Sequence, residues 1–141
     1  MIVKFYDQVE DEKLKFAVIA ARAEGKWVFC KHKARTTFEM PGGHREPGEP
    51  ILDTARRELQ EETGATAFDL QSVCVYSVTD PDNFDGAETY GLLCTAQVYA
   101  FGPIDSEMEK IVLTADLPTQ WTYPQIQPKL LAELERRGVI Q

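Results

Sequence analysis

The chain has 141 residues, 43% of them hydrophobic, so it can bury one substantial core but is too short for two ordinary domains, and we expect a single domain over residues 1–141. Its 23 acidic residues against 15 lysines and arginines give a formal net charge of −8, which argues against a nucleic-acid polymer as partner. No apolar run reaches the roughly 18 residues that span a membrane, and the N-terminus lacks a signal-peptide core, so we expect no membrane partner and a cytoplasmic location.

The first predicted elements form a hairpin. Lys15–Arg22 and Lys26–Lys31 have the composition of strands and are joined by Ala23-Glu24-Gly25, a turn of hairpin type whose glycine can adopt a positive φ. A short strand near Thr37–Met40 should then run into Pro41-Gly42-Gly43, where the glycines allow unusual φ values and a close approach to a ligand.

A helix and two long strands are expected next. Ile51–Thr63 has helical periodicity and ends at Gly64, which suits a left-handed C-terminal cap. Phe68–Val78 and Thr89–Phe101 predict two longer strands separated by a stretch rich in turn-forming residues.

The remaining elements are a short strand and a second helix. Lys110–Thr114 predicts the strand, and Pro128–Arg137 predicts the helix, with its leucines on one face and Gly138 as its stop. The order of elements indicates an α/β (α+β) fold in which a mixed sheet packs against two helices.

The cysteines indicate reduced thiols. Cys30, Cys74 and Cys94 are an odd set, widely spaced, and each lies in a predicted strand. This spacing favours neither a zinc site nor a disulfide.

Carboxylates gather between Gly43 and Ala65. At about 100° per residue on a helix, Glu58, Glu61 and Glu62 project within an arc of about 100°. The apolar stripe lies beside them rather than opposite and consists of Ile51, Leu52, Ala55 and Leu59. Carboxylates at the border of a core are poorly hydrated and repel one another, so a cation is expected nearby.

Two kinds of cation are available to this acidic face. The wheel turns Asp53, Arg57 and Gln60 toward solvent and lets Arg57 pair with Glu61 and Asp53, but one guanidinium cannot neutralise three carboxylates. Mg²⁺ could, because it prefers oxygen ligands and shares them with substrate phosphates. A solvated acidic face is the alternative, and the wheel alone does not decide between them.

The whole segment resembles the Nudix box, which reads Gly, five residues, Glu, seven residues, Arg-Glu, an aliphatic, one residue, Glu-Glu, one residue, Gly and an aliphatic. Every spacing is kept from 43 to 65, and the matching residues are Gly43, Glu49, Arg57, Glu58, Leu59, Glu61, Glu62, Gly64 and Ala65. The one departure is Ala65, which is smaller than the usual aliphatic and affects packing rather than chemistry.

The resemblance implies the family's α/β/α sandwich around a mixed sheet and a Mg²⁺-dependent hydrolase, with Mn²⁺ as a substitute ion. Its substrate would be a small-molecule nucleotide, cut at a phosphoanhydride bond in a nucleoside diphosphate linked to a further group. A non-catalytic nucleotide-binding domain is the alternative class, but such domains tend to lose box glutamates and all are present here. A homodimer is compatible with the resemblance, which leaves the oligomeric state open.

Carried over residue by residue, the resemblance implies specific roles. The metal ligands would be the carbonyl of Gly42 with Glu58, Glu61 and Glu62, whereas Arg57 would orient the glutamates and Glu49 would brace the loop or bind an outer ion. The general base stays open between Glu61 and a glutamate of a later loop, for which the candidates are Glu107 and Glu109.

Substrate choice in this family lies outside the box. Residues 37–43 resemble the segment before the box in members that remove oxidised nucleoside triphosphates, so a nucleoside triphosphate is the first expectation. ADP-ribose or another nucleoside diphosphate sugar is the second, because Pro81 stands sixteen residues after the box, where many ADP-ribose pyrophosphatases carry proline, although a turn also explains it. No tyrosine occupies that stretch, which weighs against dinucleoside polyphosphates.

Aromatic residues on strands are the candidates for base recognition, and packing in the core is the alternative role for each of them. They are Trp27, Phe29, Phe38 and Tyr76. The segment 121–124, Trp-Thr-Tyr-Pro, is left open between a contact, a substrate pocket and packing.

Overall fold

A seven-stranded sheet organises the residues described by the computed structural model, which are 1–82, 86–104, 106 and 108–140. The strand order is β1-β5-β6-β2-β3-β7, and β4 pairs with β2 outside this path. The strands are β1 (Ile2–Tyr6), β2 (Leu14–Ala23), β3 (Lys26–His32), β4 (Gly42–His44), β5 (Ala65–Thr79), β6 (Glu88–Phe101) and β7 (Met108–Thr114). The helices are α1 (Ile51–Thr63) and α2 (Gln127–Arg136), and a short 3-10 turn covers Asp11–Lys13.

The sheet is mixed and divides at β2. The pairing of β2 with β6 is parallel, whereas the other pairings are antiparallel. The last residues of β2, Ala21–Ala23, pair with β3, but its middle residues, Phe16–Val18, pair with β4. Because β3 and β4 pair with different parts of β2, the glycines of β4 join the sheet directly before the loop that leads to α1.

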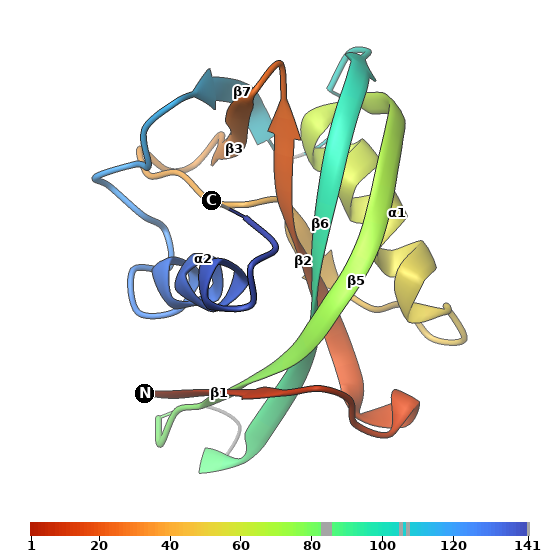
Figure 1. Ribbon diagram of the computed structural model, residues 1–141, viewed down its shortest axis with the longest axis vertical. Helices are drawn as coiled ribbons and strands as arrows, with labels where there is room; N and C mark the ends of the chain where they lie inside the picture. The colour runs from red at the N-terminus through yellow and green to blue at the C-terminus, as the bar shows by residue number, and fades with distance from the viewer. Residues whose placement is uncertain (83–85, 105, 107, 141) are drawn as a thin grey trace.

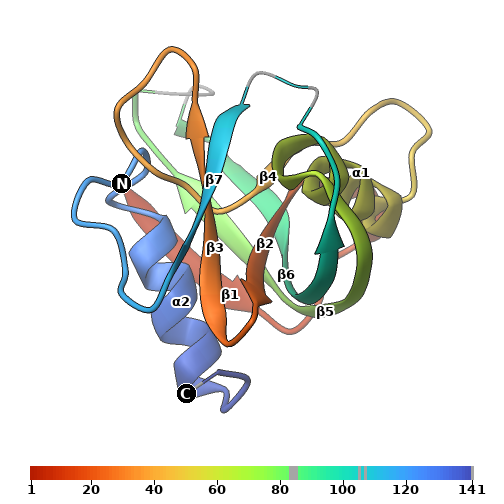
Figure 2. The ribbon, with the colours of Figure 1, turned by 90° about the horizontal axis from the view of Figure 1, so that it is seen from above.

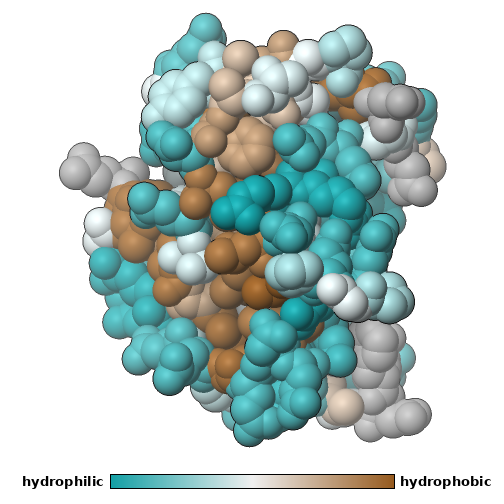
Figure 3. Space-filling model, turned by 90° about the vertical axis from the view of Figure 1, so that its right-hand side faces the viewer, coloured by the Kyte–Doolittle hydropathy of each residue, from teal (hydrophilic) through white to brown (hydrophobic). Residues whose placement is uncertain are grey.

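The two helices cover opposite faces of the sheet (Figures 1 and 2). Ala55 and Leu59 of α1 are fully buried in one core cluster. Leu130 and Leu134 of α2 are fully buried in the other. Around α1 and β5, hydrophobic surface lies among hydrophilic surface (Figure 3). Some apolar side chains that pack against the α1 core cluster, such as Phe68, are only partly buried. The α/β/α sandwich expected from the sequence is confirmed.

Most predicted elements are confirmed within a few residues, and α1 has the predicted bounds. The hairpin turn places Glu24 and Gly25 at φ of 55° and 74°, as a two-residue turn between twisted strands requires. The strand expected near Thr37–Met40 is wrong, since only isolated bridges of Phe38 and Glu39 occur there. The prediction missed β1, a five-residue edge strand that pairs with β5 alone.

The three cysteines are free and buried, so the sequence-based reading of them as thiols is confirmed. Burial raises the pKa of the Cys30 and Cys94 thiols, the latter to about 12. Among the described residues, no helix has the length and apolar character to cross a membrane.

Candidate active site

The loop before α1 and the end of the helix have well-defined backbone geometry. Gly48 in the loop has φ of 76°, a conformation that favours glycine, and Pro50 precedes the first helical residue. Gly64 ends the helix in the left-handed region at φ of 77°, and its carbonyl accepts a hydrogen bond from Gly102. The acidic residues of α1 are therefore held between two fixed turns.

Arg57 lies within an acidic cluster that consists of Glu49, Glu58, Glu61 and Glu62. Its Nε donates to Glu49 Oε2 at 2.8 Å, and its Nη1 donates to Glu58 Oε1 at 2.8 Å and to Glu61 Oε2 at 3.3 Å. Its Nη2 donates to the carbonyl of His44 at 3.0 Å. The side chain is 22% exposed, so the solvent-facing position given by the helix wheel is wrong, because the loop before α1 folds over this side of the helix.

The predicted pairing of Arg57 with Asp53 is also wrong. Asp53 pairs with Arg56 at 3.1 Å, and both side chains are about half exposed. The predicted pairing of Arg57 with Glu61 is confirmed. Arg57 thus donates to the carboxylates of α1 and of the preceding loop and to the carbonyl of His44, whereas Arg56 remains at the surface.

Glu49 connects the loop to the helix. Besides Arg57, its carboxylate accepts from the Thr54 hydroxyl at 2.6 Å and from the Glu46 N–H at 3.2 Å. These hydrogen bonds, that of Arg57 foremost, lower the pKa of Glu49 to about 2. Glu49 is therefore charged at neutral pH and holds Arg57 in place.

Glu58 and Glu62 are the least hydrated carboxylates of the cluster. The Glu58 side chain is 12% exposed, and burial raises its pKa although Arg57 opposes the shift. Glu62 Oε1 accepts the Gly42 N–H at 2.8 Å, but burial still raises the pKa of Glu62 to about 8. Glu61, by contrast, is 49% exposed. Glu58 thus shares the Arg57 guanidinium with Glu49 and Glu61, whereas Glu62 has a backbone N–H as its partner and no ion pair among the described residues.

This burial predicts an unusual pH dependence of stability in buffer free of divalent ions. Because the folded-state pKa of Glu62 is raised, the unfolded chain loses this proton at lower pH than the folded chain does. We expect the free energy of unfolding to decrease by about 2 kcal/mol between pH 5 and pH 8. Urea unfolding across this range checks it, and Glu62→Gln should flatten the profile. An equal slope in both proteins would contradict the prediction.

Gly42 and Gly43 are needed for close approach rather than for unusual φ values, since neither has a positive φ. A Cβ on Gly43 would lie 2.4 Å from Glu58 Cδ, so Glu58 packs where a side chain would stand. A Cβ on Gly42 would lie 2.5 Å from the carbonyl oxygen of Ala17 in the paired strand. The close approach that the structure shows is to the protein's own Glu58 and β2, and the expected approach to a ligand stays a prediction.

The two clashes predict different defects for two alanine variants. Gly43→Ala should fold with little loss of stability, because the flexible end of Glu58 can move away, but the displaced carboxylate should lower activity at least about 10-fold. Gly42→Ala meets backbone and should lose about 1–3 kcal/mol of stability. Thermal unfolding and activity measured on both variants check this, and equal stability losses would contradict it.

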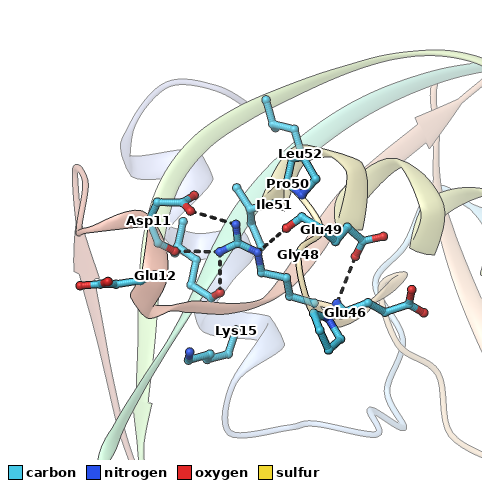
Figure 4. A pocket seen from close by; sticks show the side chains of 12 residues that line it. Asp11, Glu12, Lys15, Glu46, Gly48, Glu49, Pro50, Ile51 and Leu52 are labelled. Carbon is cyan, nitrogen blue, oxygen red and sulfur yellow. Dashed lines mark hydrogen bonds and ion pairs between the residues drawn. The ribbon is translucent and has the colours of Figure 1, made fainter.

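Arg45 anchors the loop from its other side, next to an open cavity (Figure 4). Its guanidinium donates to the carbonyls of Glu49 at 2.6 Å and Leu14 at 3.2 Å. It also donates to the carbonyl and the carboxylate of Asp11 at 2.8 and 2.9 Å. Sequence reasoning missed this residue, because most of its partners are backbone carbonyl oxygens, which every residue has and which therefore give no sequence signal.

A cavity of about 860 Å³ joins the acidic cluster to the region before α2. Its lining residues include Gly43, Glu58, Glu62, Tyr76 and Gln127. This volume lies in the range typical of small-ligand sites.

The structure brings one of the four predicted aromatic residues to this cavity. Tyr76 lines it, whereas Phe38 lines a separate, smaller cavity. Phe29 is buried with its ring centroid 5.4 Å from that of Trp121, and Arg22 lies 4.5 Å from the Trp27 ring.

The two aromatic residues of the segment 121–124, before α2, have different surroundings. Trp121 packs against Phe29, whereas Tyr123 lines the large cavity. Arg35 and Glu39, which sequence reasoning also missed, pair at 3.3 Å beside this cavity.

The structure describes one of the two glutamates that were predicted for a later loop. Glu107, predicted as a catalytic residue, lies outside the described residues. Glu109 lies on β7 and forms an ion pair with Lys31 of β3, which lowers the pKa of its carboxyl. A carboxylate held in this way is a weaker proton acceptor.

Comparisons with known proteins identify relatives for most of the chain. Residues 11–134 match the NUDIX domain. A putative 8-oxo-dGTP diphosphatase, YtkD, of Bacillus subtilis is 37% identical over 76 residues, which are 54% of this chain and 48% of that protein. An ADP-ribose pyrophosphatase of the same organism is 44% identical over 64 residues, which are 43% of this chain and 35% of that protein. The chain thus spans about half or less of the length of these curated relatives.

A solved structure extends the likeness to the whole fold. The crystal structure of a mutant of the Bacillus subtilis pyrophosphohydrolase BsRppH has a TM-score of 0.78 and 24% sequence identity, and covers 99% of this chain and 93% of that one. At this identity the likeness shows the fold alone.

Proposed function

This chain belongs to the NUDIX domain family, and from that premise we propose that it hydrolyses a phosphoanhydride bond in a nucleoside diphosphate linked to a further group, with Mg²⁺ as cofactor and Mn²⁺ as a substitute. The observation that carries the proposal is the pair of poorly hydrated carboxylates, Glu58 and Glu62, in the wall of a cavity large enough for a nucleotide. A phosphate group is anionic, so it can approach these carboxylates only with a cation between them.

The residues present fit a hard divalent cation by their chemistry. Glu58, Glu61, Glu62 and the carbonyl of Gly42 would hold it, all of them oxygen donors of the kind that Mg²⁺ prefers. Among the described residues no three acidic, histidine or cysteine side chains already converge on a metal position, because Arg57 lies between Glu58 and Glu61 and Glu62 turns to Gly42. When bound, the ion would polarise phosphate oxygens and lower the pKa of the attacking water.

The remaining proposed roles are those of the general base and of the residues that position the carboxylates. Glu61, the exposed member of the cluster, is the proposed general base that accepts a proton from water, and Glu107 stays the alternative. Arg57 orients the carboxylates through its hydrogen bonds to Glu58 and Glu61. Glu49 fixes Arg57 in turn, so the loop and the helix act as one positioned unit.

A nucleoside triphosphate, including an oxidised one, is the proposed substrate class. The similarity to a putative 8-oxo-dGTP diphosphatase supports it over 54% of the chain. ADP-ribose or another nucleoside diphosphate sugar is the second candidate, supported by the similarity to an ADP-ribose pyrophosphatase over 43% of the chain. We keep the cytoplasm as the proposed compartment, and a homodimer stays a prediction.

The experiment is a screen for phosphate and pyrophosphate release with Mg²⁺ over nucleoside triphosphates, oxidised dGTP, ADP-ribose and dinucleoside polyphosphates. Glu61→Gln should lose most of the activity. Asp53→Asn is the matched control, because it removes an exposed carboxylate of the same helix that faces away from the cluster. Release that survives Glu61→Gln would reject Glu61 as the base, and no release from any compound would favour a nucleotide-binding domain.

A further inference from the structure

Gln127, the first residue of α2, is a buried polar side chain in the cavity that holds the acidic cluster. The residue is 4% exposed. Its Oε1 accepts the backbone N–H of Met40 at 2.7 Å. An N–H group needs an acceptor, so only the oxygen of the amide can face Met40, and the orientation of the amide is fixed.

The amide nitrogen of Gln127 is left with no partner among the described residues. Among the described residues no side-chain nitrogen or oxygen is both sealed from solvent and without a hydrogen bond, so this Nε2 keeps accessible surface, and the residue lines the cavity. A ligand that covers this donor has to supply an acceptor, because a donor that is buried without one costs free energy. The side chain is thus a hydrogen-bond donor in a fixed orientation that a ligand in the cavity can use.

The surroundings of Gln127 suit a nucleobase. The largely apolar side chains of Met40 and Tyr76 line the same cavity, and Met40 is hydrogen-bonded to Gln127. Glu58 and Glu62 line this cavity too. A nucleotide with its phosphates at the acidic cluster would have its base in the cavity that Gln127 also lines.

We propose that Gln127 selects nucleotides whose base carries a keto oxygen at purine C6 or pyrimidine C4, as guanine, hypoxanthine and uracil do, over those that carry an amino group at that carbon, as adenine and cytosine do. A keto oxygen accepts from the Gln127 Nε2, whereas an amino group sets a donor against a donor and leaves both unpaired. The inference rests on the proposed function and goes beyond it, because it disfavours adenine nucleotides, including ADP-ribose.

The test compares two nucleotides that differ at this group. Inosine and adenosine triphosphate carry a keto oxygen and an amino group, respectively, at the same ring carbon. We expect the wild-type protein to have a kcat/KM at least about 10-fold higher for inosine triphosphate. Equal values for the two nucleotides would overturn the proposal while leaving the proposed hydrolysis intact.

Gln127→Glu is the decisive variant. Its carboxylate can still accept the Met40 N–H, so the anchor of the side chain is kept, but the atom that faces the cavity changes from donor to acceptor. We expect the preference to fall at least about 10-fold and to turn toward adenosine triphosphate. Gln125→Glu is the control, because it adds the same charge at an exposed position two residues away. An unchanged preference in Gln127→Glu would overturn the proposal.

A binding measurement tests the proposed base preference even if the protein hydrolyses neither nucleotide. Calorimetric titration with the α,β-imido analogues of the two triphosphates measures the same discrimination without turnover. Tighter binding of the inosine analogue that is lost in Gln127→Glu would support the proposal even if the hydrolase assignment failed. Equal affinity for both analogues would reject it.

Discussion

We expect Glu58→Gln to lower kcat/KM by about 10²-fold or more without destabilising the fold. The glutamine keeps an oxygen that can accept from Arg57, which now donates to Glu58 at 2.8 Å. It removes, however, a negative charge that burial already opposes and that Glu61 and Glu49 repel. The lost charge matters chiefly for binding a divalent metal ion, so we expect lower activity but an unchanged stability of the metal-free fold.

Activity with Mg²⁺ and thermal unfolding with and without Mg²⁺ check this expectation together. The wild-type melting temperature should rise when Mg²⁺ is added, because an ion that binds the folded state stabilises it, and the rise should be smaller in Glu58→Gln. Asp53→Asn should behave as wild type in both measurements, because Asp53 pairs with Arg56 at the surface. A Glu58→Gln protein with wild-type turnover would remove Glu58 from the proposed metal ligands.

Local signals explain why α1 could be predicted from the sequence. The helix has the predicted first and last residues because its apolar period and the left-handed Gly64 depend on neighbouring residues only. The carboxylates at 58, 61 and 62 then share one side as a consequence of helical geometry. Sequence reasoning therefore located the acidic cluster.

Contacts between distant segments account for what the sequence did not predict. Arg57 is half-buried because the loop residues His44 and Glu49 fold over α1, which a helix wheel does not contain. Gly42 and Gly43 form a strand because they pair with β2, about 25 residues earlier in the chain. Gln127 enters the cavity through a hydrogen bond to Met40, 87 residues away. A lone glutamine before a proline gives no sequence signal for such a role.

Arg57→Ala should have the largest combined effect on stability and activity. The substitution leaves Glu49 and Glu58, 14% and 12% exposed, without their cation, and unpaired carboxylates then face one another. We expect a loss of about 1–3 kcal/mol of unfolding free energy at pH 7 and at least about a 10-fold loss of activity. Urea unfolding and steady-state kinetics measure the two losses.

Arg56→Ala is the matched control for this prediction. Arg56 is the preceding residue of the helix and pairs with Asp53. The two side chains are 49% and 57% exposed, so the loss of this pair should cost at most about 1 kcal/mol. Added Mg²⁺ should return part of the lost stability to Arg57→Ala, because the ion supplies positive charge to the same carboxylates. If the two arginine variants were equally stable and Mg²⁺ affected neither, the carboxylates would have to be solvated, and the acidic face of α1 would be ordinary protein surface.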